Sequence, residues 1–560
     1  MAKIHTLKIS NYRGIQNFEQ IFGMTDFVCL IGRGDSGKTT ILEAISVALS
    51  PNWNLSFYDT DFYNGVISNS IEIEVSLYDL PTALLHESKF GLYKRFLNND
   101  GFIIDDIQDD DLDDKIDILT VKLVVDKELE PKWYIVNDRA VQSDIEIRAN
   151  DRASLNVFLV SDFVDRHFSW NKGNPLYSLL REDDASTGKT NIIIDAFREV
   201  KEKIDPTSFS HLDGVVTKIK SAASELGVNI DSTTTTIDFR DISIKDGRIC
   251  LHVDKVPFRL KGKGAKRLIS IAIQTELAKS GGIILIDEIE QGLESDRARH
   301  LVKALNRNNL GQVFITTHSS DVLVELEAQN IFLKNIDLQY LTKFDTSFQG
   351  CLRKNPEAFF TKKIIVCEGA TEIGICRAIN NHRIDESKSS FAISGVGIVD
   401  GSGSNFIQYC EKFKDAGFEV SSFCDSDDNS INFKKVNLND NGINVIDCKN
   451  DYSIEQQIFE DLPWDAVKEI IEYAFNEKGS KSVKDSLESK SSNTLPKDWD
   501  KIESSGIREV LGVVSKENGW FKRIDHGEFL GKICCGNEMD ISVKILGKIF
   551  KEINDWVDDA

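Results

Sequence analysis

The pattern of hydrophobic and polar positions predicts a strand, a glycine-containing loop and a helix near the start of the chain. Lys3–Ser10 alternates polar and apolar residues, and Phe27–Ile31 is a short apolar run that is typical of a buried parallel strand. From Lys38 to Leu49 the apolar residues recur near helical spacing. The segment 32–37 therefore joins a buried strand to a helix.

A second α/β region is predicted from about residue 256 to 335. It has apolar strands at Ile283–Ile286 and Gln312–Thr316, with a helix around Arg297–Asn306 between them. We expect this region to complete the domain that the first strands begin.

The stretch between these two regions mixes strands with two short amphipathic helices, at Ile192–Ile204 and Leu212–Leu226. Neither helix sustains apolar heptads over several repeats, so no long coiled coil is predicted. We expect a compact insertion here.

The pattern weakens between about 338 and 361, and a new apolar strand begins at Lys362–Cys367. We place a domain boundary there, because strands and helices then alternate to about residue 450. Residues 476–500 are rich in Ser, Lys, Asp and Asn and are predicted to form an exposed segment.

Composition limits the class of protein. The 560 residues, of which 41% are hydrophobic, are too many for one core and predict about two to four domains. No apolar run approaches the roughly 18 residues of a membrane span, and the first residues lead into a strand and not into a secretory signal, which predicts a cytoplasmic protein. The ten cysteines are scattered without a CxxC pair, which predicts buried reduced thiols.

Charge limits how the chain can bind nucleic acid. A formal net charge of −23 argues against coating of nucleic acid by the whole surface, so any DNA site must be local. The acidic run Asp105–Asp114 could bind cations, but runs of like charge are usually solvated loops, and we favour a loop.

The loop after the second strand matches a phosphate-binding motif. Gly32–Thr39 fits the P-loop pattern GxxxxGK[ST], in which backbone N–H groups surround phosphate oxygens at the start of a helix. Lys38 is expected to reach the β and γ phosphates, and Thr39 to bind Mg²⁺. The predicted nucleotide-binding residues of this loop are Gly32, Gly34, Asp35, Ser36, Gly37, Lys38, Thr39 and Thr40.

Two later strands end in residues that suit the same site. Ile283–Ile286 delivers Asp287, expected to hold the metal ion, and Glu288, placed to polarise an attacking water. His318 follows the next strand, where a histidine could sense the γ phosphate. The alternative for Asp287 and Glu288 is an ordinary strand followed by a charged turn.

The second domain carries a set of carboxylates. Glu368 ends the strand that opens this domain, Glu372 follows a glycine turn, and Asp425 and Asp427 end a later strand. Such carboxylates can converge on a hard cation, since Mg²⁺ prefers oxygen ligands. The alternative is a set of acidic turns in an α/β domain.

The first domain resembles the ATPase heads of the ABC class, especially the RecF and SMC branch. The residues that carry this resemblance are the P-loop and the opening segment Lys8–Ile15. In such heads a signature segment of one subunit closes over the ATP of the other, and the matching stretch here is Leu260–Arg267. It lacks the serine of LSGGQ and contains four basic residues, among which Lys263 is expected to contact nucleotide.

The second domain resembles Toprim, whose hallmark is a glutamate on one strand and a DxD on another. An ATPase head followed by Toprim is the arrangement of the OLD (overcoming lysogenization defect) nuclease family, which includes the nuclease subunit of the Gabija phage-defence system. The resemblance implies two-metal phosphodiester cleavage by Glu368, Asp425 and Asp427. It further implies that Glu455 is a metal ligand and that Lys522 stabilises transition-state charge, although surface residues are the alternative for both.

We therefore predict an α/β chain with an N-terminal ABC-type (RecF/SMC-like) ATPase head that holds an inserted dimerisation region. A C-terminal Toprim domain of Rossmann-like α/β architecture follows, with a helical extension. The predicted regions are the head at 1–85 and 256–337, the insertion at 86–255, a linker at 338–361, the Toprim core at 362–460 and its C-terminal extension at 461–560. The insertion is expected to be part of the head and to supply dimerisation helices.

The resemblance implies an ATP-regulated DNA endonuclease that uses ATP and Mg²⁺ or Mn²⁺ and acts in anti-phage defence. It also implies a homodimer or higher oligomer, and a helicase or other defence partner could join it. The second hypothesis is a RecF-type DNA-binding ATPase clamp in DNA repair without nuclease activity. A topoisomerase or primase fits less well, since the cysteines provide no zinc-binding module.

Overall fold

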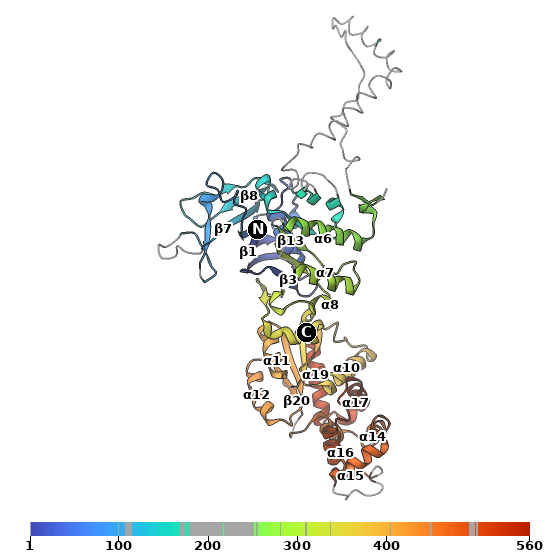
Figure 1. Ribbon diagram of the computed structural model, residues 1–560. Helices are drawn as coiled ribbons and strands as arrows, with labels where there is room; N and C mark the ends of the chain where they lie inside the picture. Colours follow the sequence, from blue (N-terminus) through green and yellow to red (C-terminus); the bar gives the residue numbers. More distant parts are fainter. Residues whose placement is uncertain are drawn as a thin grey trace.

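The computed structural model describes two α/β units, one above the other in Figure 1, with a further group of helices at the C-terminal end. The described residues are 2–98, 100–106, 115–168, 174–176, 178–179, 217, 251–253, 256–279, 282–307, 311–335, 338–403, 405–448, 451–491, 499 and 502–559. The two helices predicted in the insertion lie outside these residues except for Thr217, as does the acidic stretch 107–114.

The centre of the first unit is a sheet of six strands in the order β10-β13-β14-β3-β15-β16. All neighbours are parallel except β15 and β16, which are antiparallel. The strands are β3 (Phe27–Ile31), β10 (Val157–Val160), β13 (Ile283–Ile286), β14 (Gln312–Thr316), β15 (Ile331–Leu333) and β16 (Thr342–Lys343). The strands predicted at β3, β13 and β14 are confirmed to the residue.

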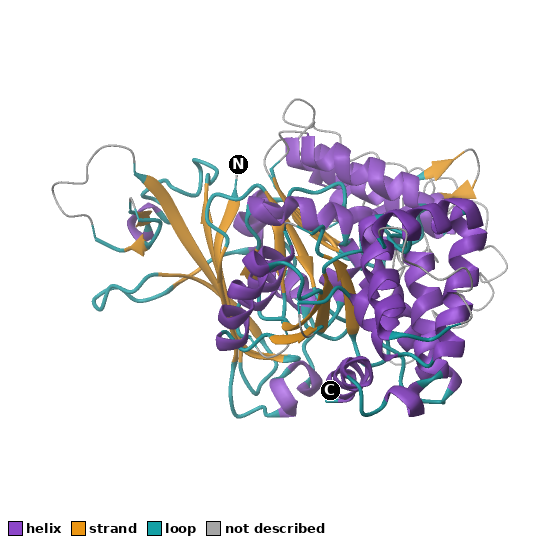
Figure 2. Cartoon of the chain, turned by 90° about the horizontal axis from the view of Figure 1, so that it is seen from below, coloured by secondary structure: helices purple, strands orange, loops and turns teal. Residues whose placement is uncertain are grey.

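A second, antiparallel sheet of the first unit has the order β2-β1-β4-β7-β5-β6, with β8 and β9 continuing from β7. Its strands are β1 (Lys3–Tyr12), β2 (Ile15–Ile21), β4 (Ile71–Tyr78), β5 (Arg95–Leu97), β6 (Ile103–Ile104), β7 (Ile116–Val125), β8 (Pro131–Val136) and β9 (Ile145–Glu146). Figure 2 shows these long strands extending away from the helices. Residues from both sheets and from α1 (Lys38–Ala48) share one buried core, which includes Leu7, Ile45 and Leu285.

The region predicted as an insertion contributes strands to both sheets of the head. β7 pairs with β4 in the antiparallel sheet, and β10 pairs with β13 at the edge of the central sheet. Two further strands, β11 (His252–Val253) and β12 (Val256–Pro257), form a short hairpin.

Helices cover the central sheet. α1 and α6 (Lys263–Lys279) contact its strands, and the other helices of this unit are α2 (Ala149–Arg152), α7 (Ser295–Arg307) and α8 (Ser320–Leu323). The helix predicted around Arg297–Asn306 is α7. Its buried residues Ala298, Val302 and Leu305 lie at the spacing of one helix face.

The segment predicted as a linker is packed. It contains β16, the 3₁₀ turn η10 (Thr346–Phe348), α9 (Gln349–Lys354) and the 3₁₀ turn η11 (Pro356–Phe360). Phe348 and Phe359 pack edge-on or tilted against Phe413 of the second unit, with ring centroids 5.7 and 5.4 Å apart. One hydrophobic core therefore runs from the head through this segment into the second unit.

The second unit is built on a parallel sheet in the order β18-β17-β19-β20. Its strands are β17 (Lys363–Cys367), β18 (Val396–Asp400), β19 (Glu419–Cys424) and β20 (Asn444–Asp447), and its helices are α10 (Ala370–Asp385), α11 (Phe406–Asp415) and α12 (Asn429–Asp440). The first strand in the chain is central, so the connections leave it in opposite directions. The crevice at the carboxyl ends of β17 and β19 is therefore a topological switch point, where ligands bind in open α/β sheets.

The C-terminal region is helical. Its helices are α13 (Ile454–Asp461), α14 (Trp464–Lys478), α15 (Ser480–Lys490), α16 (Ser505–Glu517), α17 (Ile524–Gly536), α18 (Glu538–Ile541) and α19 (Ile545–Asp558). α15 falls in the stretch predicted to be an exposed segment, and its Val483 and Leu487 are buried. α17 packs closely on α10, since a Cβ on Gly527 would lie 3.0 Å from the Cα of Gly374.

None of the described helices is long and apolar enough to cross a membrane. The nine cysteines that the described ranges contain are buried and free, in agreement with the prediction from composition.

Candidate functional site

The P-loop has the backbone geometry that its glycines predict. Gly32 has φ of +143°, and a Cβ there would lie 2.5 Å from the carbonyl oxygen of Lys334, so only glycine fits. Gly37, at the start of α1, has φ of +94°. A cavity of about 540 Å³ opens over this loop. Its lining includes Gly34, Asp35, Ser36, Gly37, Lys38, Thr39, Thr40, Glu288, Thr316 and His318.

Lys38 lies in this cavity, and its ammonium group is hydrogen-bonded to the backbone of the P-loop. Its Nζ donates to the carbonyl oxygens of Gly32 at 2.9 Å and Arg33 at 2.7 Å. Burial lowers the pKa of Lys38 to about 8, and the carboxylates of Asp287 and Glu288 oppose that shift. A cation that has lost much of its hydration suits the phosphates of a nucleotide.

Thr39 and Asp287 meet across the sheet, although 248 residues separate them. Thr39 Oγ1 lies 3.0 and 3.1 Å from the two carboxylate oxygens of Asp287. Thr316 Oγ1, at the end of β14, donates to Asp287 Oδ1 at 2.7 Å. A hydroxyl and a carboxylate brought together beside the P-loop are the oxygen ligands that Mg²⁺ prefers.

Glu288 and His318 face the same cavity. Glu288 has φ of 47°, and its N–H donates to Thr316 Oγ1 at 2.6 Å. Burial, and next the charge of Lys38, lower the pKa of the His318 ring. His318 is therefore neutral near pH 7, which suits a hydrogen bond to a phosphate oxygen.

Lys263 lies apart from these residues. It is exposed at the start of α6 and is not among the residues that line the P-loop cavity. Within one chain the structure brings Lys38, Thr39, Asp287, Glu288 and His318 together, and it does not bring Lys263 to them.

The carboxylates of the second unit converge at the switch point. Glu368 follows β17 and Asp425 follows β19, and the N–H of Asp425 donates to Glu368 Oε2 at 3.1 Å. Asp425 Oδ1 accepts from the N–H of Ile454 at 2.7 Å, which ties the cluster to the start of α13. Glu455, the next residue of α13, is buried with 3% of its surface exposed.

The electrostatics of this cluster are those of a cation site. Burial raises the pKa of Asp425 and Glu372 well above the usual range, and the nearby carboxylates, including Glu455, raise both further. Burial also raises the pKa of Glu368, and the charge of Asp427 adds to this effect. Carboxylates that repel one another away from water are stabilised by a divalent cation, so the donor set fits Mg²⁺ or Mn²⁺.

Glu372 also has a structural role. Its Oε2 accepts the N–H of Gly369 at 3.0 Å and so caps the first turn of α10. Because this side chain is tied to the helix start, it presents its carboxylate to the cluster in a fixed position.

Comparison with protein families identifies the two domains that contain these sites. Residues 27–325 match a family model described as an AAA domain, putative AbiEii toxin, type IV TA system. Residues 359–427 match a model described as an overcoming lysogenization defect protein-like TOPRIM domain. The chain belongs to the OLD family of ATPase–Toprim proteins. The predicted family and fold class are thus confirmed, whereas the particular likeness to the Gabija nuclease subunit stays a prediction.

Other comparisons give distant likenesses. The chain is similar to the Smc head domain with an extended coiled coil bound to the C-terminal domain of ScpA, derived from Pyrococcus furiosus, at 13% identity and a TM-score of 0.33, covering 61% of this chain and 96% of that one. It is similar to the SMC head domain from Thermotoga maritima at 13% identity and a TM-score of 0.27. This match covers 61% of this chain and 99% of the other chain. The recombination mediator protein RecF-ATPrS of the RecFOR pathway matches at 12% identity and a TM-score of 0.30. This match covers 61% of this chain and 98% of the other chain. No curated protein matches the chain.

In this OLD family chain, the lysine that reaches the carboxylates is Lys516, which sequence reasoning missed. Lys516, on α16, forms an ion pair with Asp427, and that bond raises its pKa against the effect of burial. Lys522 is exposed, after the end of the same helix, and no contact among the described residues places it at the cluster. Lys435 holds the backbone at Asp425, because its buried Nζ donates to the carbonyl oxygen of Asp425 at 2.5 Å.

The ATPase half of this OLD family chain also contains two residues that the motifs did not single out. Glu290 accepts the N–H of His318 and the hydroxyl of Thr317, both at 2.7 Å, and so holds the histidine loop. Arg267, of the signature segment, is buried and donates to the carbonyl oxygen of Glu288 at 2.8 Å. Both lie near motif residues in sequence, which was the only signal for them.

ATPase and Toprim domains together indicate an enzyme that acts on nucleic acid with a nucleotide and a divalent metal ion.

Proposed function

We propose that this chain is an ATP-regulated, metal-dependent DNA endonuclease whose cutting centre is the Toprim carboxylate cluster. The observation that carries the proposal is the convergence of Glu368 and Asp425 at the switch point, with the buried Glu372 and Glu455 beside them. A purely structural acidic cluster would not place mutually repelling carboxylates on four separate elements of one crevice.

The chain's residues have distinct roles in this proposal. Glu368, Asp425 and Asp427 hold the metal ions, with Glu372 and Glu455 completing the ligand set. When bound, Mg²⁺ or Mn²⁺ supplies Lewis acidity and lowers the pKa of a bound water.

Lys516 acts from the other side of the cluster. Its ammonium group is paired with Asp427, and we assign to it the stabilisation of the negative charge that develops on a phosphate bound to the cluster. Lys435 holds the turn that carries Asp425, and its other contact is Asp447 Oδ2 at 3.2 Å.

The contacts between the two units support regulation by ATP. The ring of His318 lies 6.2 Å from that of Phe360, which is three residues before β17. On the other side, a Cβ on Gly395 would lie 2.7 Å from Nη1 of the P-loop residue Arg33. A nucleotide that moves either residue therefore acts directly on the loops and strand of the Toprim sheet.

The proposal includes DNA as substrate and a homodimer in which Lys263 of one head contacts nucleotide in the other. Exposure of Lys263 supports that contact, because a residue that acts across subunits must face outwards in one chain. A role in anti-phage defence, with a helicase or similar partner, rests on membership of the OLD family.

Cleavage of supercoiled, linear and single-stranded DNA tests the proposal. The purified full chain should cut DNA with Mg²⁺ or Mn²⁺ and stop when a chelator is added, and ATP should change the rate. A chain that binds DNA and ATP but cuts none of these substrates under any of these conditions would instead be the RecF-type clamp.

Two lysine variants test which lysine stabilises transition-state charge: Lys516, which the structure indicates, or Lys522, which the sequence indicated. Lys516→Ala should lower the cleavage rate by about 10²- to 10³-fold, the usual effect of removing one group that stabilises transition-state charge. Lys522→Ala, six residues later and exposed, is the matched control and should cut within about twofold of the parent. A large loss in the control with a normal Lys516→Ala rate would return the role to Lys522.

A further inference from the structure

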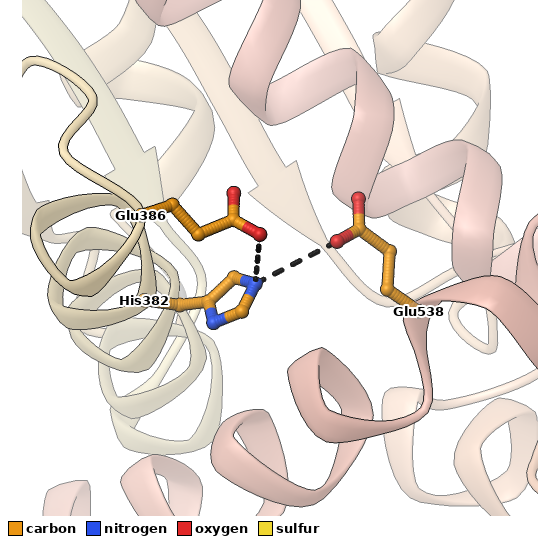
Figure 3. A group of neighbouring side chains, drawn as sticks. All are labelled: His382, Glu386 and Glu538. Carbon is orange, nitrogen blue, oxygen red and sulfur yellow. Dashed lines mark ion pairs between the residues drawn. The ribbon is translucent and has the colours of Figure 1, made fainter.

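A second group of metal-binding side chains lies at the opposite end of α10 from the Toprim cluster. His382 is in the last turn of α10, Glu386 follows directly after the helix, and Glu538 begins α18. Figure 3 shows the imidazole of His382 facing the carboxylates of both glutamates. Glu372, of the carboxylate cluster, is ten residues before His382, or about 15 Å along the helix.

Two distances in this group are close to those between ligands of one metal ion. His382 Nε2 lies 3.4 Å from Glu386 Oε1 and 3.6 Å from Glu538 Oε2. One ligand atom from each of the three residues lies within 4.8 Å of the other two. Tetrahedral ligands with bonds of about 2.0–2.1 Å are separated by about 3.4 Å, which is close to both distances from His382 Nε2.

The ring nitrogen itself lacks a hydrogen bond. His382 Nε2 is shielded from solvent and makes no hydrogen bond among the described residues, although it points at two carboxylates. A shielded ring nitrogen that makes no hydrogen bond costs free energy unless a ligand satisfies it.

The surroundings favour a cation. The position is the C-terminal end of α10, where the helix dipole stabilises positive charge and disfavours Glu386. Lys388 offsets only part of that charge, because its Nζ contacts the other oxygen of Glu386, Oε2, at 2.8 Å. Oε1 therefore remains directed at His382.

We propose that His382, Glu386 and Glu538 bind one Zn²⁺ or similar divalent transition-metal ion. Imidazole nitrogen with two carboxylates suits Zn²⁺, whereas Mg²⁺ prefers oxygen ligands alone. Because the ligands come from α10 and α18, the ion ties the helix that starts at the Toprim cluster to the C-terminal helices. This site is structural and is separate from the proposed cutting centre.

Equilibrium dialysis of the full chain against Zn²⁺ tests this site, with excess Mg²⁺ present to occupy the Toprim carboxylates. After treatment with a chelator, the parent should bind one Zn²⁺ at this site, and Zn²⁺ should raise its midpoint of thermal unfolding. His382→Ala and Glu538→Gln should each weaken Zn²⁺ binding at least about tenfold and remove the thermal shift. Glu538 is exposed, so its variant should fold even if the histidine variant does not.

The controls are His300→Ala in α7 and Glu411→Gln in α11, both exposed residues away from the group. They should bind Zn²⁺ like the parent. A parent that binds no Zn²⁺, or a Glu538→Gln chain that binds it with unchanged affinity, would show that the three residues form only an ion-pair group. Zn²⁺ binding does not depend on DNA cleavage, so its failure and the failure of the nuclease proposal are distinguishable.

Discussion

Asp425→Asn is expected to abolish DNA cleavage and, at the same time, to stabilise the metal-free protein. The rate should fall on the order of 10³-fold, because loss of a carboxylate that holds the metal ions removes several kcal/mol of transition-state stabilisation. The free energy of unfolding should rise by about 1–3 kcal/mol at pH 7.5, because the substitution removes a buried carboxyl group that the other carboxylates of the cluster repel. The measurements are plasmid cleavage with Mn²⁺ and denaturant unfolding in chelator.

The sign of the stability change follows from the raised pKa of Asp425 in the folded state. In the unfolded chain its pKa is about 3.9, so this group favours folding most below that pH and loses its contribution as pH rises through the raised folded value. The metal-free parent should therefore gain stability as pH falls from 7.5 towards 5.5. The amide that Asp425→Asn introduces does not titrate, so the variant should show a smaller gain.

A neutral substitution at an exposed aspartate of the same unit gives the control. Asp440→Asn, in α12, should change neither the cleavage rate nor the stability appreciably. The amide side chain of the Asp425→Asn variant keeps an oxygen that can accept the N–H of Ile454, so the fold is retained. Asp425→Asn protein that cuts DNA at the parent rate would remove the metal-ligand role of this residue.

The motif residues of each site could be predicted from sequence, because they directly follow short buried strands. β3, β13, β14 and β17 are apolar runs, and the residues directly after them are Gly32, Asp287, Thr317 and Glu368. In a parallel sheet such positions share one edge, so local order in the sequence becomes proximity in space. Recognition of the Toprim and ATPase patterns followed from this.

The residues that support these sites were not predictable in the same way. Lys516 reaches Asp427 from a helix about 90 residues later, and nothing in its local sequence distinguishes it from Lys522 or the other lysines of this region. Its position depends on how α16 packs on α13, which is a property of the tertiary fold. Similarly, the aromatic core around Phe348 and Phe359 is spread over a segment with weak periodicity, which therefore looked like a linker.

Lys38→Met should abolish the pH dependence of ATP binding as well as weaken the binding itself. At pH 7 the ATP affinity should fall by about 10- to 100-fold, the effect of losing a charge-assisted hydrogen bond to phosphate. For the parent, the pKa of Lys38 is about 8, so a growing fraction is neutral as pH rises from 7 to 9. ATP binds the protonated form, and the affinity should therefore be about tenfold weaker at pH 9 than at pH 7.

Calorimetry at fixed Mg²⁺ measures the ATP affinity as a function of pH. Comparison of the variants then shows whether the loss of affinity between pH 7 and pH 9 comes from Lys38 alone. His318 does not contribute to it, since its lowered pKa keeps the ring neutral throughout the range. Lys279→Met, at an exposed lysine of α6, should keep both the affinity and the slope of the parent. If Lys38→Met bound ATP as tightly as the parent at pH 7, or retained the tenfold loss at pH 9, the P-loop lysine would not be the group that holds the phosphates, and control of DNA cutting by ATP would have to begin elsewhere in the head.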